Sequence, residues 1–342
     1  MTLIARPDRD DLASVAVIGA GISGLICART LADRGLRVTV FEKSRGVGGR
    51  MATRRMQDNL AFDHGAQYFT VFDSRFREYV RSWQQAGLVA PWIGLIRVVC
   101  EGRVDPCGTE RKRLVGAPAM NALCRHLAAE IDIRLQCEVA LLEAVGCLWR
   151  LVDRSAVSLG QYDFVVVSAP GPQTARLLER APDLASQAGR VAMQPCWAVL
   201  AAFDERLSTD FDGAFVHQSP LSWVSRNSSK PGRSSTPECW VLHASQGWST
   251  DHLEAAEEEV AEDLLQALWE ATRLRPVRPF VVEAHRWRYA MAREPLQAGC
   301  LFDADTGLVA CGDWCFGSRV EGAFLSGLAA AESVLRSAAK RR

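Results

Sequence analysis

The feature that most constrains the fold of this chain is a glycine-rich turn between an apolar and a helical segment, SVAVIGAGISGLICARTLADRG. The apolar run 14–18 predicts a buried parallel strand, and the periodicity of 23–34 predicts a helix that stops at Gly35. The segment 36–42 predicts a second strand, ending at Glu42. A strand–turn–helix–strand unit with GxGxxG in its turn is the dinucleotide fingerprint.

Each glycine of this turn has a physical purpose in that interpretation. Gly19 allows the tight turn, Gly21 lets a pyrophosphate approach the backbone, and Gly24 lets the helix pack closely on the strand. The helix N-terminus stabilises the phosphates, and Glu42 accepts hydrogen bonds from a ribose 2′-hydroxyl. The alternative is a structural glycine-rich turn that binds nothing.

A second glycine group follows in EKSRGVGGRMATRR, residues 42–55. Gly48 and Gly49 permit close approach of a ligand, and Arg45 and Arg50 offset phosphate charge. This spacing resembles the GG motif of the flavin amine oxidase superfamily, where the loop packs against the pyrophosphate and ribitol of FAD. The alternative for the arginines is a place on the solvated surface.

The segment FDHGAQYF, residues 62–69, also fits that superfamily, in which a glycine-containing segment passes near the flavin ring. Gly65 and Ala66 would allow that approach, and Gln67 and Tyr68 would face the ring or the substrate. His64 is a candidate base, although a lone histidine is more often structural.

A third motif, ACGDWCFGSRVEGAFLSGLAAA (310–331), resembles the second flavin motif of FAD enzymes. The resemblance implies that Asp313 bonds the ribitol and that residues 320–323 place a helix N-terminus beneath the flavin ring. Nothing matches the covalent flavin site of monoamine oxidases, so we expect non-covalent FAD. The expected FAD contacts are Gly19, Ala20, Gly21, Ser23, Gly24, Glu42, Lys43, Arg45, Gly48, Gly49, Arg50, Gly65, Ala66, Gln67, Val139, Gly312, Asp313, Val320, Glu321, Gly322 and Ala323.

Nearly the whole chain resembles the renalase family, particularly its bacterial members. The resemblance is carried by the three motifs above together with WVSRNSSKPGR, ECWVLHAS and AHRWRYA. It implies an oxidase that converts 2- or 6-dihydro isomers of NAD(P)H to NAD(P)+ by hydride transfer to flavin N5. Dioxygen would then accept the electrons and give hydrogen peroxide. The alternative on the same scaffold is a flavin amine oxidase or desaturase, and a third possibility is a flavoprotein whose FAD is structural.

Further segments predict a discontinuous α/β architecture. Buried strands are expected at 163–170 and 308–313, a hairpin at 139–153, antiparallel strands between 190 and 290, and a flexible loop at 227–237. Helices are expected at 75–86, 117–129, 250–271 and 319–337. The expected fold is a Rossmann-like FAD-binding domain with an inserted, mainly antiparallel β-sheet plus helix substrate domain, as in monoamine oxidase and p-hydroxybenzoate hydroxylase. The domains are expected at 14–75, 115–175 and 292–338 for FAD, and at 76–114 and 176–291 for the substrate.

Two observations on residue types favour a dinucleotide substrate over an amine. Many amine oxidases place a lysine near flavin N5, but this chain has four lysines, and Lys230 lies in a Ser/Pro/Gly loop that predicts a surface turn. An aromatic cage for an amine is also hard to assemble from four tyrosines. A basic rim would suit a pyrophosphate, although each of its cations could be merely solvated; it comprises Arg226, Lys230, Arg233, Arg286 and Arg288.

The substrate ring needs positioning more than a base, because hydride loss from a dihydropyridine creates an aromatic cation directly. Asn227 and His243 are candidates to bond the carboxamide, Trp287 to wall the pocket, and Arg288 to complete the site. The alternative for each is core packing or solvation.

Composition limits the other classes of function. The chain has 40 acidic and 40 basic residues, so bulk charge gives no indication of nucleic-acid or membrane binding. Eleven scattered cysteines without a CxxC predict reduced thiols in a cytoplasmic protein, and no metal site is expected. The segment MTLIARPDRDD lacks the apolar core of a signal peptide, and no stretch reaches the length of a membrane span. We therefore expect a small-molecule dinucleotide and O2 as partners.

Overall fold

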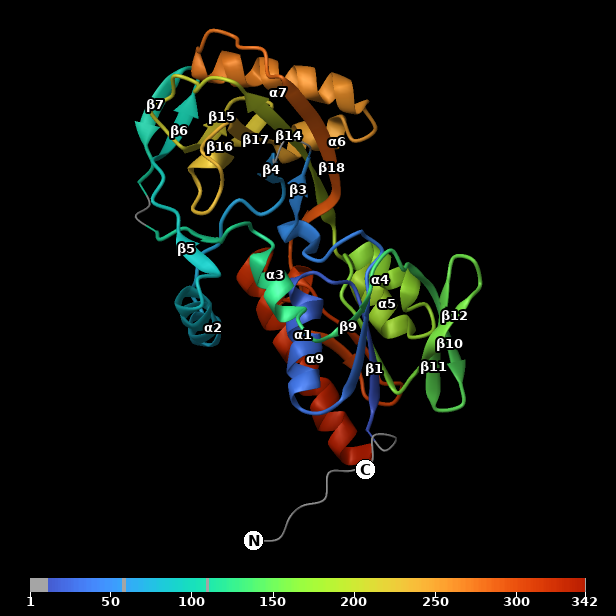
Figure 1. The fold of residues 1–342 in the computed structure, drawn as a ribbon. Coiled ribbons are helices and arrows are strands. Elements are labelled where there is room, and N and C mark those ends of the chain that lie inside the picture. The colour runs from blue at the N-terminus through green and yellow to red at the C-terminus, as the bar shows by residue number, and fades with distance from the viewer. Residues whose placement is uncertain (1–11, 57–59, 109–110, 342) are drawn as a thin grey trace. The chain divides into compact units, whose positions relative to one another are not determined.

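The structure is a computed structural model that describes residues 12–56, 60–108 and 111–341 (Figure 1). Residues 1–11, on which the signal-peptide argument rests, lie outside the described residues. The chain forms two compact units, each built from separate segments. Unit 1 comprises Met1–Gly49, Cys124–Ala192 and Ala292–Arg342, and unit 2 comprises Arg50–Leu123 and Met193–Met291. These bounds differ from the expected ones because 50–75 and 115–123 cluster with unit 2, and 176–192 with unit 1.

Unit 1 is centred on a six-stranded sheet in which only the edge pair β19–β20 is antiparallel. Val15 pairs with Phe164 on one side and with Val38 on the other, so β1 is central and its apolar side chains are buried. The sheet order is β19 (Leu301–Asp303), β20 (Leu308–Ala310), β13 (Phe164–Val167), β1 (Ser14–Ile18), β2 (Arg37–Phe41) and β9 (Asp132–Arg134).

Two helices of unit 1 pack closely on each other through small residues. Helix α1 (Ile22–Asp33) lies against α9 (Val320–Arg341), and a Cβ added to Gly327 of α9 would clash with the carbonyl oxygen of Ser23. The shorter helices are α4 (Gly171–Leu177), α5 (Pro182–Gly189) and α8 (Asp313–Phe316).

A separate three-stranded sheet in unit 1 consists of β10 (Val139–Val145), β11 (Leu148–Asp153) and β12 (Ser158–Tyr162). Its first two strands are the predicted hairpin; the third was not predicted. The helix expected at 117–129 is shorter, because α3 spans only Ala122–Leu127, across the boundary between the two units.

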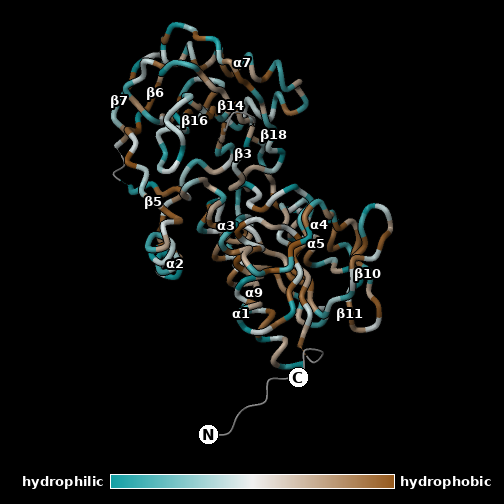
Figure 2. Tube along the Cα trace, in the orientation of Figure 1, coloured by the Kyte–Doolittle hydropathy of each residue, from teal (hydrophilic) through white to brown (hydrophobic). Residues whose placement is uncertain are grey.

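Unit 2 begins with short elements that lead into helix α2 (Ser74–Gln85). Asp73 caps α2 by accepting from the backbone N–H of Arg75, and Phe76, Val80 and Trp83 form its buried stripe. The rest of this helix is strongly hydrophilic (Figure 2). Two small sheets pair β3 (Thr53–Arg55) with β4 (Ala61–Asp63), and β5 (Val89–Pro91) with β8 (Leu114–Gly116). Single 3₁₀ turns lie at Gly49–Met51, across the unit boundary, and at Asn227–Ser229.

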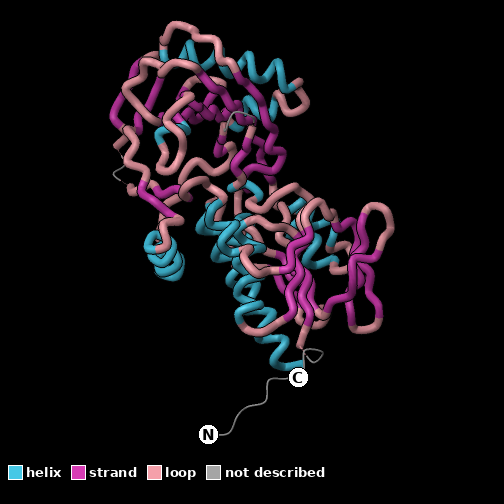
Figure 3. The backbone as a smooth tube through the Cα atoms, in the orientation of Figure 1, coloured by secondary structure: helices cyan, strands magenta, loops and turns pink. Residues whose placement is uncertain are grey.

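The main sheet of unit 2 has seven strands and is mixed. Figure 3 colours the strands magenta. The pair β15–β6 is parallel, whereas β14–β17, β17–β16, β16–β15 and β6–β7 are antiparallel. The sheet order is β18 (Val281–Ala292), β14 (Met193–Phe203), β17 (Glu238–Ala244), β16 (Leu221–Arg226), β15 (Gly213–His217), β6 (Ile96–Cys100) and β7 (Arg103–Pro106).

The helix expected at 250–271 is two helices, α6 (Gln246–Asp251) and α7 (Glu257–Thr272). Ser245 caps α6 by accepting from the backbone N–H of Trp248, and α6 ends at His252. Three glutamates in the first turn of α7 suit the positive end of the helix dipole. The apolar face of α7 packs on the sheet and closes a core that contains Trp197, Phe203 and Trp240.

Both units together confirm the predicted fold class of a Rossmann-type α/β unit with a mainly antiparallel sheet unit. Among the described residues, no helix is long and apolar enough to cross a membrane. The same residues contain no group of three His, Cys, Asp or Glu side chains placed to hold a metal ion.

Candidate functional site

The glycine-rich turn of unit 1 follows β1 and opens α1. Gly19 has φ +107°, and a Cβ there would lie 2.6 Å from the carbonyl oxygen of Ser168, so the turn requires glycine. A Cβ on Gly24 would clash with the carbonyl oxygen of Gly19. A Cβ on Gly21 would meet nothing within 4 Å, so this residue faces open space at the N-terminus of α1. No side chain caps that N-terminus, which leaves its N–H groups available to an anion.

Glu42 ties this turn to the second glycine group. Its carboxylate accepts from the backbone N–H of Ala20 and from that of Ser44, both at 2.8 Å. The N–H of Gly48 donates to the carbonyl of Ala20 at 2.8 Å, which brings the two groups side by side. Each carboxylate oxygen retains a lone pair for a further donor, so this geometry is compatible with a ribose hydroxyl.

The C-terminal motif follows β20 in the same sheet. The N–H of Gly312 donates to Ser326 Oγ at 3.0 Å, and Asp313 is buried. Gly322 is in the first turn of α9, where a Cβ would clash with the carbonyl oxygen of Gly317. Because β1, β2, β13 and β20 are parallel, the three motifs that follow β1, β2 and β20 share the carboxyl edge of the sheet. That edge is where doubly wound sheets bind nucleotides, so the residues present fit FAD.

The other residues expected to contact FAD lie in different surroundings, some exposed, one buried in unit 1 and some bonded within unit 2. Lys43 and Arg45 are exposed, and Val139 is the buried first residue of β10. Arg50 Nη1 donates to the carbonyl of Ala290 at 2.8 Å within unit 2. Gly65 packs on the backbone of Arg50, with which a Cβ would clash, so this contact by itself accounts for its being glycine.

A buried charged cluster organises unit 2 around Asp63 at the end of β4. Its carboxylate accepts from Arg233 Nη2 at 2.5 Å and from Thr53 Oγ1 at 2.7 Å, and lies 3.6 Å from Lys230 Nζ. The backbone N–H of Met120 donates to the same carboxylate at 3.1 Å. Burial alone would raise the pKa of Asp63, but the adjacent Lys230 and Arg233 outweigh it and lower that pKa.

The expectation that Lys230 is a surface residue is wrong, because its side chain is fully buried. Its ammonium donates to Gln67 Oε1 and to Asn227 Oδ1, both at 3.1 Å, in addition to its pairing with Asp63. Burial is the main cause that lowers the pKa of Lys230, to about 8. The loop expected to be flexible from 227 therefore begins as a buried, hydrogen-bonded turn.

The side-chain amides of Gln67 and Asn227 form hydrogen bonds within unit 2. Gln67 donates to the carbonyl oxygens of Asp63 and Gly65 and accepts from Ser225 Oγ at 2.7 Å. Asn227 donates to the carbonyl of Ala61 at 2.8 Å and accepts from the backbone N–H of Asp63. Both amides are thus fixed by hydrogen bonds within unit 2, and the ring and carboxamide contacts expected of them remain predictions.

His243 and Trp287 converge on the backbone carbonyl of His64, which accepts from Nε2 of the first and Nε1 of the second, both at 3.0 Å. A carbonyl can only accept, so His243 carries its proton on Nε2. Burial lowers the pKa of His64 to about 3 and that of His243 to about 4. Both imidazoles are therefore neutral near pH 7, and His64 is unsuited to be a base there.

Four aromatic side chains of unit 2 pack together around Trp223. We call them the aromatic group, and they are Tyr68, Trp92, Trp223 and Phe215. The ring centroid of Trp223 lies 5.5 Å from that of Tyr68, 6.3 Å from that of Trp92 and 4.8 Å from that of Phe215. The indole Nε1 of Trp223 is buried and has no hydrogen-bond partner among the residues that the structure describes. Two tryptophans thus take part in this aromatic packing, in a chain that has only four tyrosines.

The expected basic rim is instead a set of ion pairs. Arg286 and Arg288 both pair with Glu254 at 2.7 Å, and Arg288 is exposed at 40% of its side chain. Arg226 is buried between Asp212 and Glu238, at 3.0 and 3.3 Å. With Lys230 and Arg233 paired to Asp63, all five cations have acidic partners within unit 2.

Asp63 is the main residue that sequence reasoning missed. A signal was available, because Asp63 ends a short apolar strand, and Lys230 and Arg233 are spaced three apart in one turn. Only the fold shows that segments 164 or more positions apart in the chain meet there.

Comparison with known proteins places the chain among flavoenzymes. The profile of the family described as flavin containing amine oxidoreductase matches residues 94–335, and that of the NAD(P)-binding Rossmann-like domain matches residues 17–83. The chain is similar to cyclohexylamine oxidase from Brevibacterium oxydans IH-35A, with 13% identity and a TM-score of 0.72 over 96% of this chain and 99% of that one. At this identity the similarity shows the fold alone.

Curated relatives match over short segments. A 4,4′-diapophytoene desaturase from Staphylococcus haemolyticus is 42% identical over 76 residues, which cover 19% of this chain and 15% of the desaturase. Protoporphyrinogen oxidase 2 from Arabidopsis thaliana is 52% identical over 56 residues, which cover 16% of this chain and 11% of that protein.

Proposed function

Because the chain belongs to the flavin containing amine oxidoreductase family, we propose that it is an FAD-dependent oxidase that removes hydride from a carbon atom of a small amine. Bound FAD would supply the hydride acceptor, with dioxygen as the final oxidant that yields hydrogen peroxide. The supporting relatives are a cyclohexylamine oxidase of the same fold and a desaturase that is similar over a short segment.

The aromatic group of unit 2 is the observation that carries this proposal. Its rings provide apolar walls for the hydrocarbon part of an amine, and the unpaired Nε1–H of Trp223 offers one donor. The neighbouring Lys230 lies with its ammonium 5.6 Å from the centroid of the Trp92 ring. A fixed positive charge at that place disfavours a protonated amine and so favours the neutral form, whose lone pair assists hydride loss.

Three features of unit 1 would hold FAD in this proposal, and the first is the N-terminus of α1, whose N–H groups receive the diphosphate. Glu42 accepts from the adenosine ribose, and the N-terminal turn of α9 stabilises negative charge at the flavin. We propose non-covalent binding, as no segment matches the covalent site of monoamine oxidases. Denaturation should therefore release all of the flavin into the supernatant, and flavin that remains with the precipitated chain would contradict this mode.

Renalase-like oxidation of dihydro-NAD(P) isomers is the second candidate. It is favoured by the neutral imidazoles of His64 and His243, because a dihydropyridine needs orientation and no base. The ion pairs of Arg226, Arg286 and Arg288 weaken the earlier argument for a grip on the pyrophosphate.

Anaerobic mixing of the FAD-loaded protein with a panel of substrates separates the two candidates. We expect primary amines with an apolar body to bleach the flavin, and 2- and 6-dihydro-NAD(P) to bleach it more slowly. Faster bleaching by the dinucleotides would reverse the order of the candidates. A flavin that no compound of either class reduces would leave a structural FAD and reject both.

Replacing Tyr68 by Leu tests the aromatic group itself. Loss of its ring contacts should raise the Kd of a reducing amine about two- to tenfold, as such contacts contribute about 0.5–1.5 kcal/mol beyond the buried area. Tyr79→Leu is the control, because Tyr79 is exposed on α2 and packs on Trp83. Equal effects of the two replacements would show that the aromatic group does not bind the substrate.

A further inference from the structure

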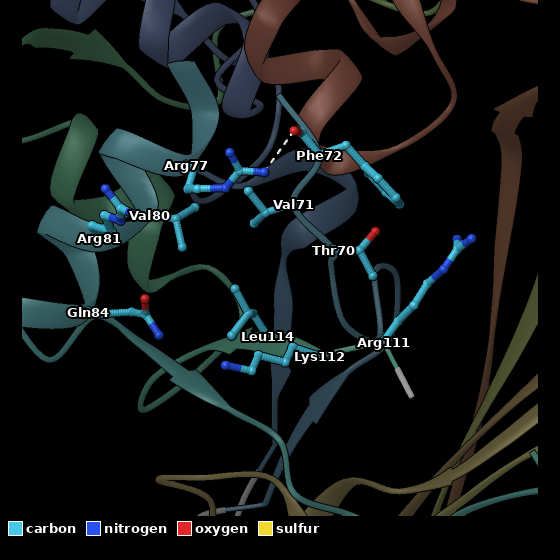
Figure 4. Close-up of a pocket in the computed structure, with 10 residues that line it drawn as sticks. All are labelled: Thr70, Val71, Phe72, Arg77, Val80, Arg81, Gln84, Arg111, Lys112 and Leu114. Carbon is cyan, nitrogen blue, oxygen red and sulfur yellow. Dashed lines mark hydrogen bonds between the residues drawn. The ribbon is translucent and has the colours of Figure 1, made fainter. Parts of the chain in front are cut away.

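A cavity of about 380 Å³ in unit 2 lies between helix α2 and two facing segments of the chain (Figure 4). Side chains of α2, of 70–72 and of 111–114 surround it, and none of them belongs to the FAD motifs or to the aromatic group. Its lining residues are Thr70, Val71, Phe72, Arg77, Val80, Arg81, Gln84, Arg111, Lys112 and Leu114.

Four of these residues are cationic, and no acidic residue of the described chain lines the cavity. Arg77 and Arg81 are one helical turn apart on α2, so their like charges repel. Arg111 and Lys112 come from the facing segment. Arg81 and Lys112 make no hydrogen bond or ion pair with any residue that the structure describes. This contrasts with the five cations paired to Asp63, Asp212, Glu238 and Glu254.

The remaining cations of the cavity are held in place by Phe72. Arg77 Nη2 donates to the Phe72 carbonyl at 2.9 Å, and the guanidinium of Arg111 lies 5.4 Å from the centroid of the Phe72 ring. The Arg77 side chain keeps further N–H donors beyond this bond. Positive charge on partly fixed donors, with no acidic side chain among the described lining residues, makes the cavity suited to an anion, and to phosphate above all.

The floor of the cavity is apolar, which sets a second requirement on the ligand. Val80 and Leu114 are buried and Val71 is half-buried, while the ring of Phe72 is 46% exposed at the rim. In Figure 4 the three aliphatic side chains lie between the cations of the two sides. A ligand that satisfies both features has an apolar part and a phosphate group. The volume falls at the lower end of small-molecule sites, about 300–1,000 Å³, and so favours a mononucleotide over a dinucleotide.

We propose that this cavity is a binding site for a nucleoside phosphate, separate from the FAD site, with the base on Val71, Val80 and Phe72 and the phosphate between Arg81 and Lys112. The site would make the protein responsive to a soluble nucleotide. The inference does not depend on the identity of the oxidised substrate.

Calorimetric titration of the FAD-saturated protein with ADP tests this site, because saturation removes the FAD site from competition. We expect ADP to bind with one-to-one stoichiometry and without release of flavin, and adenosine to bind at least about tenfold more weakly.

The double replacement Arg81→Ala/Lys112→Ala should weaken ADP binding at least about tenfold and reduce its salt dependence. Both side chains are exposed, so the fold should persist. Arg75→Ala, which removes a cation of the same helix that is paired with Asp73 and lies outside the lining, is the matched control.

The proposal is overturned if ADP does not bind to the FAD-saturated protein, or if the double replacement and Arg75→Ala change its affinity equally. It is also overturned if vesicles with anionic headgroups bind through Arg81 and Lys112 while ADP does not, since the cavity would then recognise a membrane surface. ADP binding is measured without turnover. Failure here therefore leaves the oxidase proposal standing, and failure of flavin reduction leaves the nucleotide site standing.

Discussion

At the scale of single residues, Asp63 is the acid on which the interior of unit 2 depends. It offsets the buried charges of Lys230 and Arg233, and removal of one partner of a buried ion pair typically costs about 3–5 kcal/mol. We therefore expect Asp63→Asn to lower the free energy of unfolding, measured in urea, by that amount. Glu283→Gln is the control, because its pair with Arg54 is about 42% exposed and should contribute less than about 1 kcal/mol. Similar losses in the two variants would contradict the role of Asp63.

The buried histidines predict a pH dependence of stability. Burial lowers the pKa of His64 to about 3 and of His243 to about 4, against an unfolded value of about 6.5, so the unfolded chain binds protons first as the pH falls. Their contribution is complete above about pH 6.5 and is lost progressively below it. As the pH falls from 6.5 to 5, each histidine should lower the free energy of unfolding by about 2 kcal/mol. His243→Gln should remove its share of this slope in denaturation curves, and an unchanged slope would show that His243 titrates normally.

Residue roles were the least predictable from sequence. Lys230 stands in SSKPGR, a composition typical of exposed turns, and becomes fully buried because Asp63, Gln67 and Asn227 surround its ammonium. Those partners are distant in sequence, apart from Asn227, and no local pattern reveals such a meeting. The same holds for Glu254, whose pairing with Arg286 and Arg288 offsets two of the five charges of the predicted basic rim.

At the scale of elements, the glycines of the first turn separate folding from cofactor binding. Gly24→Ala should destabilise the protein even without FAD, because its Cβ would clash with the carbonyl of Gly19. Gly21→Ala should fold normally, since its Cβ meets only open space, yet bind FAD at least about 1.4 kcal/mol more weakly, a tenfold loss. Thermal unfolding of the apoprotein and FAD titration measure the two effects. Normal FAD affinity in folded Gly21→Ala would place the diphosphate elsewhere.

Elements with strong local signals were predicted well. The strand β1, helix α1 and strand β2 lie within one residue of their expected bounds, because apolar runs and Gly35 mark their ends. The error at 250–271 arose where acidic, alanine-rich sequence continued the helical pattern across the break at 252–256. The pairing of β6 with β15 joins Ile96 to Gly213, and such long-range contacts leave no periodic trace.

At the scale of the whole molecule, the sequence order of the strands predicted a nucleotide-binding unit interrupted by a second unit. Apolar strands at 14–18, 164–167 and 308–310 all belong to one parallel sheet, as buried runs should. The bounds of the segments differ from the expected ones, because residues 50–75 cluster with unit 2 (Arg50–Leu123 and Met193–Met291). They do so although they carry flavin-like motifs. Tertiary contacts, which no single segment encodes, decide that assignment.

We propose that the protein removes hydride from the carbon next to an amine nitrogen. The most direct test of this proposal is anaerobic flavin reduction by a reducing amine and by the same amine with deuterium on that carbon, in single-turnover mixing. We expect the flavin to bleach with both, and the deuterated amine to reduce it several-fold more slowly at saturation, because the carbon–hydrogen bond breaks in that step. Equal rates at saturation, or a flavin that stays oxidised with every amine, would contradict it.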